Sequence, residues 1–213
     1  MLDKTTTKTP TQIIISPPNF QIAKVRCVGD SPFVANKMSS ENRKKMMDKQ
    51  ESGERSKKGE KRKPKDFDAI YKGSMHVAAK GGWNGIPASA FRAAMISACR
   101  VVGFQMTRAK LSVFVEADGI DSDDGQPLIR IYGKPERRDM AVKLADGSTD
   151  IVSRGFFFPW HVDLRVKWDG DQFSADDVMN LLARAGQQVG VGAGRNDSKN
   201  SCGMGWGVFH IES

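Results

Sequence analysis

Alternating apolar and polar positions predict strands at residues 111–117 and 156–168, and β-branched content with a turn signal at 29–32 predicts one at 20–29. Strands are also expected at 128–133 and 205–212, and a further strand is expected to enter within 67–79. Successive side chains of a strand point to opposite faces of its sheet, so the alternation also predicts the facing of each residue. In segment 156–168, one face carries His161, Asp163, Arg165 and Lys167, and the other carries Val162, Leu164, Val166 and Trp168. One face of this strand is therefore polar and the other apolar.

Two segments repeat apolar residues at helical spacing. In the first, 81–103, Pro87 suits a first helical turn and Gly103 suits the C-terminal end. The second helix is expected to start after Ser174, an N-cap residue with Asp177 three positions later as an approximate capping box. The order strand, helix, two or more strands, helix, strand predicts an α+β fold, specifically a modified ferredoxin-like (RRM-like) βαββαβ domain.

The domain organisation follows from where composition changes. Residues 1–12 are polar and predicted to be a flexible tail, and 13–213 are predicted to form one domain. A charged segment, 37–68, is expected as an insertion before the first long helix, and 134–155 as a second excursion with a hairpin turn at residues 146–147. An antiparallel sheet with both helices on one face leaves the other face free, and RNA-recognition domains of this type bind nucleic acid there.

Nearly all of the net charge lies in the first insertion. Between Arg43 and Lys65 the sequence has eleven Lys or Arg and four Asp or Glu, a net charge of +7 out of +8 for the chain. A segment of this kind favours a polyanion because binding releases condensed counterions. The alternative is a solvated loop whose charge only aids solubility.

Several common chemistries are not supported by the motifs. The sequence "GVGAG" at 190–194 follows a helix rather than a strand, so it does not indicate a dinucleotide site. Three separated cysteines suggest neither zinc nor a disulfide framework, and the acidic loop with Asp121, Asp123 and Asp124 does not complete a calcium-binding pattern. We therefore predict no catalytic residue, metal or cofactor. No apolar run is long enough to span a membrane and no secretory signal is evident, so we expect a cytoplasmic protein.

Basic and aromatic residues remain as the candidate functional groups, since Arg and Lys bind phosphate and Trp offers a stacking surface worth roughly 1–3 kcal/mol per base. Seven glycines within 186–207 would let the backbone approach a phosphate chain, or would simply form a flexible connector. The predicted nucleic-acid-binding residues are Lys37, Arg43, Lys44, Lys45, Lys80, Trp83, Asn84, Ser89, Arg92, Arg137, Arg138, Trp160, His161, Gly194, Arg195, Lys199 and Trp206.

Three stretches resemble one family. "VRCVGDSPFVAN" (25–36), "GIPASAFRAAMISACR" (85–100) and "VGVGAGRNDSKNSCGMGWGVFHIE" (189–212) are similar to the first strand, helix start and glycine-rich loop of the RAMP superfamily. The family is best known for the repeated backbone subunits of CRISPR effector complexes in antiviral defence. In this sequence Ala88 replaces a family glycine and Trp206 replaces a usual arginine.

The resemblance implies a modified ferredoxin-like fold and binding of single-stranded, guide-type RNA along a head-to-tail array of subunits, with other effector subunits as further partners. It points to Ser89 and Arg92 at the helix start and to Gly194, Arg195 and Lys199 in the glycine loop. It also implies that an insertion such as 37–68 extends over the nucleic acid.

We therefore expect a non-catalytic subunit that binds single-stranded RNA, with DNA left open, and assembles with copies of itself. One alternative is a metal-independent RNA-processing endonuclease, for which Asp30 and His76 are the nearest candidates. A second alternative is a protein-interaction or inhibitory subunit of a mobile element.

Overall fold

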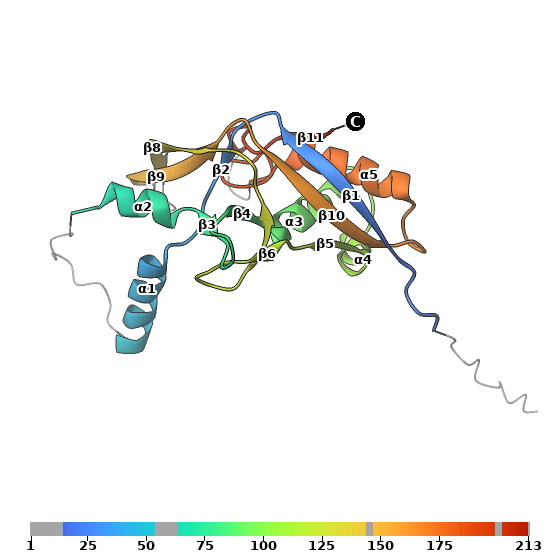
Figure 1. Cartoon of the computed structure of the whole chain (residues 1–213), viewed down its shortest axis with the longest axis horizontal. Coiled ribbons are helices and arrows are strands. Elements are labelled where there is room, and N and C mark those ends of the chain that lie inside the picture. Colours follow the sequence, from blue (N-terminus) through green and yellow to red (C-terminus); the bar gives the residue numbers. More distant parts are fainter. Residues whose placement is uncertain (1–14, 54–63, 144–146, 199–201, 213) are drawn as a thin grey trace, which may run out of the picture.

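A four-stranded antiparallel sheet forms the centre of the fold, with the strand order β11-β1-β10-β5 (Figure 1). Its strands are β1 (Phe20–Gly29), β5 (Val113–Glu116), β10 (His161–Asp169) and β11 (Phe209–Ile211). The structure is a computed structural model, and it describes residues 15–53, 64–143, 147–198 and 202–212. Four of the predicted segments supply these strands, although only three residues of 205–212 are in strand conformation.

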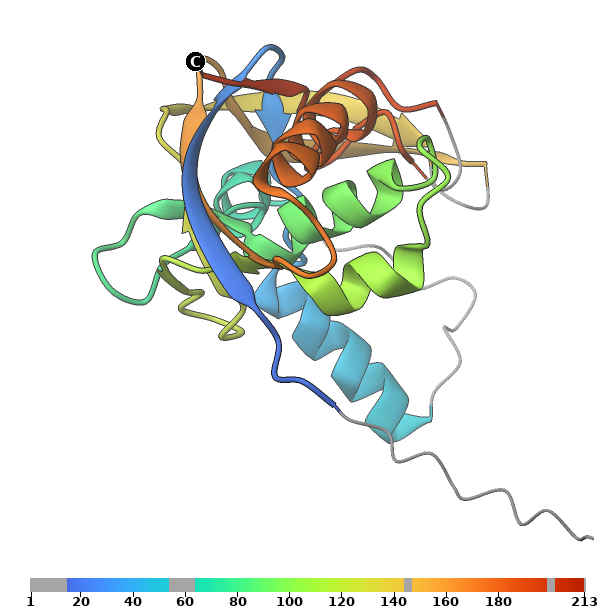
Figure 2. The same cartoon turned by 90° about the vertical axis from the view of Figure 1, so that its right-hand side faces the viewer.

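Two helices cover one face of this sheet, namely α3 (Ala88–Ala98) and α5 (Ala175–Arg184), which continues into the π-helical turn η1 (Ala185–Val189). Figure 2 shows α3 and α5 on the same side of β1. The predicted alternation in β10 is confirmed, because Val162, Leu164, Val166 and Trp168 are buried and the residues between them are half-buried. The Ser174 capping box that starts α5 is also confirmed.

The segment between β1 and α3 contains β2 (Phe33–Val34), α1 (Ser40–Ser52), α2 (Phe67–Gly73), β3 (His76–Val77) and β4 (Asn84–Pro87). Helix α1 buries no residue and projects away from the sheets (Figure 1). The prediction that a strand enters within 67–79 is wrong for most of this segment, because only His76 and Val77 are in strand conformation. Asp66 caps a helix there instead, by accepting hydrogen bonds from the backbone N–H groups of Asp68 and Ala69.

The segment between α3 and β10 contains α4 (Met106–Ser112), which was not predicted, and then β5, β6 (Gly119–Ile120), β7 (Pro127–Arg130), β8 (Pro135–Lys143) and β9 (Thr149–Phe157). The predicted strand at 128–133 belongs to a separate sheet of order β3-β4-β7-β6. The excursion at 134–155 is a hairpin, β8 and β9, that extends a third sheet with β2.

The protein is an α+β protein, and its described residues form three antiparallel sheets. Within the described ranges, no helix combines the length and apolar character needed to cross a membrane.

Candidate functional site

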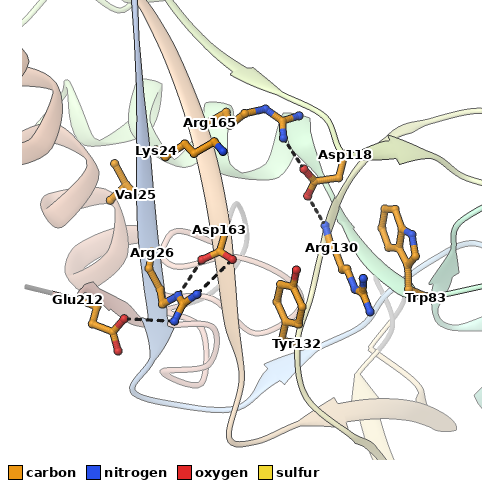
Figure 3. Close-up of a pocket in the computed structure, with 10 residues that line it drawn as sticks. All are labelled: Lys24, Val25, Arg26, Trp83, Asp118, Arg130, Tyr132, Asp163, Arg165 and Glu212. Carbon is orange, nitrogen blue, oxygen red and sulfur yellow. Dashed lines mark hydrogen bonds and ion pairs between the residues drawn. The ribbon is translucent and has the colours of Figure 1, made fainter. Parts of the chain in front are cut away.

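The helix-free face of the central sheet carries charged side chains at paired positions of β1 and β10. Lys24 lies opposite Arg165, and Arg26 lies opposite Asp163. A groove of about 710 Å³ opens over this face, and β7 and the residue before β4 close its far side (Figure 3). The residues that line it are Lys24, Val25, Arg26, Trp83, Asp118, Arg130, Tyr132, Asp163, Arg165 and Glu212.

Carboxylates hold two of the groove's arginines in fixed positions. Arg26 donates to Asp163, with 2.7 Å between Nε and Oδ1, and this hydrogen bond holds the pKa of Asp163 below its ordinary value. Arg165 donates to Asp118 at 2.9 Å and to the carbonyl of Ala117 at 2.5 Å. Both guanidinium groups therefore are oriented before any ligand arrives.

Two other cations line the groove, and the nearby charge of one of them, Lys24, also helps to lower the pKa of Asp163. Among the described residues, neither Lys24 nor Arg130 forms an ion pair. Lys24 is the cross-strand partner of Arg165, whose guanidinium is directed to Asp118 and the Ala117 carbonyl, and like charges at paired positions repel each other. The Arg130 guanidinium lies 4.9 Å from the centre of the Tyr132 ring. An anion at this point would relieve the repulsion.

Aromatic rings lie beside these cations. Tyr132 stacks on His161, with ring centres 4.6 Å apart and planes 5° from parallel, and the two residues exchange backbone hydrogen bonds. Trp83 is half-buried and lies against Gly119, where a Cβ atom would come within 2.9 Å of the indole. The groove thus combines cationic groups with half-buried aromatic side chains, and one face of the Tyr132 ring is already covered by His161.

Most of this groove was not among the predicted site residues. Lys24, Arg26, Arg130, Tyr132 and Arg165 were all missed. The alternation of β10 had already placed Arg165 on a polar face, so a signal for it existed. Arg130 and Tyr132 come from another sheet, and nothing local in the sequence places them beside β1.

Of the residues predicted around the first long helix and β10, the structure brings Trp83 to the groove, and His161 stacks on Tyr132 without lining the groove itself. Asn84 is half-buried in β4, where its carbonyl accepts from the N–H of Ile131. The prediction for Trp160 is wrong. It is 1% exposed in the core and donates through Nε1 to the carbonyl of Ser31, so no base can stack on it.

The basic insertion divides into paired and exposed residues. The prediction that Lys37 binds nucleic acid is wrong, because its ammonium is buried and lies 2.7 Å from the Asp121 carboxylate. Arg43 pairs with Asp123, and Lys45 pairs with Glu41 within α1. Lys44 and Lys80 are exposed, and within the described part of the chain neither forms an ion pair.

Four further predicted residues lie outside the groove. Ser89 is exposed in the first turn of α3, whereas Arg92 donates to the carbonyls of Val113 and Lys110 at the edge of the sheet. Arg137 pairs with Asp68 and Asp139, and Arg138 lies over the Phe156 ring at 4.9 Å. Arg92 and Arg137 therefore have internal partners that compete with a phosphate.

The glycine-rich loop packs mainly against its own backbone. Val191 donates to the Gly207 carbonyl at 3.0 Å, and Ala193 donates to Val34 at 3.0 Å. Trp206 lies over Gly194 and makes an edge contact with Phe156. Arg195 is exposed and donates to the Gly192 carbonyl, and Lys199 lies outside the described residues. Close packing accounts for Gly194 and Gly207 without a ligand.

A cavity of about 430 Å³ lies near the base of α1 and is lined by His76, Arg43 and Ser89, among others. His76 Nδ1 lies 2.7 Å from Asp121 Oδ2, and ligand atoms of His76, Asp121 and Asp124 lie within 4.8 Å of one another. Burial alone would raise the pKa of Asp121, but hydrogen bonds from Lys37, the Asp123 N–H and His76 lower it to about 2.

The ammonium of Lys37 thus already compensates the buried carboxylate. The other cleavage candidate, Asp30, accepts from Gln187 and lies 2.5 Å from His210 Nδ1.

Comparison with protein-family models and with curated proteins finds no match to this chain.

Proposed function

We propose that the protein binds single-stranded nucleic acid without cutting it, and that the strand lies in the groove on the helix-free face of the central sheet. The observation that carries the proposal is the placement of Lys24 opposite Arg165, with Arg130 and two aromatic side chains beside them. Phosphates bind at the cations and release counterions, and a base stacks on Trp83.

The carboxylates of the groove limit its affinity. Four cations and three carboxylates line it, so the groove by itself has little excess charge. The exposed lysines of the basic insertion add attraction at longer range. We therefore expect moderate, sequence-tolerant binding that depends on salt.

The proposal includes a ferredoxin-like arrangement of RAMP type. Counted along the chain as one to four, the central strands have the spatial order four-one-three-two, with α3 and α5 as the two crossover helices, and this order supports the proposal. The projecting helix α1, on which Met46 and Met47 are about half exposed, supports head-to-tail contact between copies.

The direct test is fluorescence anisotropy with a labelled strand of about 12 nucleotides, comparing RNA, DNA and the matching duplex. We expect single strands to bind more tightly than the duplex. With about three phosphates neutralised, the logarithm of the association constant should fall with a slope of about −2 against the logarithm of salt concentration. Equal affinity for duplex, or binding that salt does not change, would contradict the proposal.

The competing activities need two further measurements. Labelled RNA recovered at full length after prolonged incubation distinguishes a binder from a nuclease that uses Asp30 or His76. The ratio of absorbance at 260 and 280 nm, read with the size-exclusion mass, distinguishes a nucleic-acid complex from a protein-only assembly. Cleaved RNA, or a protein-only complex indifferent to RNA, would favour the corresponding alternative.

A further inference from the structure

The helix-free face continues beyond the groove into an exposed apolar patch at the other end of β1. Phe20 is 43% exposed and Ile22 is 55% exposed. Phe20 meets Phe114 of β5 edge to face, with ring centres 5.8 Å apart. Apolar side chains gathered on a sheet face that no helix covers indicate a contact surface.

Cations accompany these rings. Lys167 Nζ lies 4.4 Å from the centre of the Phe20 ring, and the Arg92 guanidinium lies 4.9 Å from the centre of the Phe114 ring. Arg92 is held there because its Nε donates to the Val113 carbonyl at 2.9 Å. Across the described chain, neither Lys167 nor Arg92 forms an ion pair.

The strand register joins this patch to the groove. Lys24, Arg165 and Glu116 occupy one row across β1, β10 and β5, and the next row on the same face holds Ile22, Lys167 and Phe114. The two rows are about 7 Å apart along the strands. A chain that leaves the groove along β1 therefore meets Lys167 and the two phenylalanines next.

We infer that Phe20 and Phe114 form a second base-stacking site for the same nucleic-acid strand, so that the binding site extends across the whole helix-free face. This inference rests on the proposed function and specifies its ligand as a strand longer than the groove alone holds. The unpaired ammonium of Lys167 favours a nucleic acid over an apolar protein surface, because such a surface would desolvate it without supplying a carboxylate.

The test compares wild type with Phe20→Leu, which removes the ring but keeps an apolar side chain, on strands of about 3 and about 12 nucleotides. We expect Phe20→Leu to weaken binding of the long strand by about fivefold or more and to leave the short strand unchanged. Phe158→Leu is the matched control, since Phe158 is 53% exposed and does not line the groove. The variant Phe114→Leu should behave as Phe20→Leu does.

Three outcomes would overturn the inference, and they differ in what they say about the proposed function. If Lys24→Gln weakens binding of the long strand and Phe20→Leu does not, the inference of a second stacking site is wrong and the proposal of binding in the groove is kept. If neither strand binds, both proposals fail. If Phe20→Leu changes the size-exclusion mass and not RNA affinity, the patch is a protein interface.

Discussion

Lys24 and Arg165 face each other directly across the antiparallel pair of β1 and β10. Cross-strand pairs of like charge are destabilising, and a fold selected only for stability would avoid one. Arg165 is partly compensated by Glu116 and Asp118, whereas among the described residues Lys24 has no ion pair. The cost is small and local, and the phosphate that we propose to bind at Lys24 would offset it.

The variant Lys24→Gln separates binding from stability. We expect weaker RNA affinity and a salt slope that is shallower by about 0.7, because one phosphate contact is lost. The free energy of unfolding should stay the same or rise by a few tenths of a kcal/mol, since the repulsion is relieved. Anisotropy titrations at several salt concentrations and urea unfolding measure the two effects.

The control for this variant is Lys72→Gln, which removes an exposed lysine of α2 that does not line the groove. Both variants lose one positive charge from the chain. If they weaken binding equally, the effect comes from net charge and the Lys24 contact is refuted.

The glycine loop gives a second prediction, which tests whether its glycines serve packing. Gly207 has a φ of 69°, and a Cβ atom there would lie 1.8 Å from the Val191 carbonyl oxygen. Gly205 has a φ of 73°, but a Cβ atom there would meet nothing within 4 Å. Gly205→Ala should therefore cost about 1–2 kcal/mol of unfolding free energy, the conformational penalty alone.

We expect Gly207→Ala to cost several kcal/mol more, or to prevent folding, because the backbone of residue 191 has to move as well. Thermal unfolding followed by circular dichroism gives the comparison. Equal costs for the two variants would mean that the close approach of the two backbone segments is not tight in solution.

Local chemistry predicted the parts of the fold that depend on neighbours in sequence. The alternation through β10 correctly assigned its faces, and Ser174 with Asp177 correctly marked the start of α5. Asp66 gave the same kind of capping signal for α2, and the β-branched and aromatic residues after it obscured that signal. The α+β class followed from the order of these elements.

The groove could not be predicted in the same way, because one side comes from the central sheet and the other from segments far from it in the sequence. Tyr132 reaches His161 only because β7 leads into a bridge with β10, and Trp83 reaches the site from the turn before β4. Lys37 belongs to a run of basic residues, yet a buried carboxylate 84 positions away removes it from the surface. Composition cannot distinguish a lysine that binds a ligand from one that binds Asp121.

The buried pair of Lys37 and Asp121 predicts an acid-dependent stability. The pKa of Asp121 is about 2 in the folded protein against an ordinary value of 3.8, so the ionised carboxylate stabilises the fold. This contribution, about 2 kcal/mol, is fully present above pH 4 and is lost as the pH falls to about 2. The pair joins the base of α1 to the loop after β6.

Asp121→Asn should lower the unfolding free energy by about 3–5 kcal/mol at pH 7, because the Lys37 charge stays buried without its partner. The difference from wild type should shrink by about 2 kcal/mol between pH 4 and pH 2. Urea unfolding at four pH values measures it, with Asp48→Asn on the exposed helix α1 as the control. A difference that does not change with pH would refute the low pKa.

Two tryptophans that the sequence grouped together should respond in opposite ways to substitution. Trp160 is 1% exposed and packs against Phe33 and Phe209, so Trp160→Ala should lower the unfolding free energy by about 3–5 kcal/mol. Trp83 is half-buried at the edge of the groove, so Trp83→Leu should cost less stability and should weaken RNA binding about fivefold or more. Anisotropy at a temperature where each variant is folded separates the two effects. If Trp83→Leu binds RNA as wild type does, bases do not stack at this side of the groove, and the proposed path of the strand is wrong.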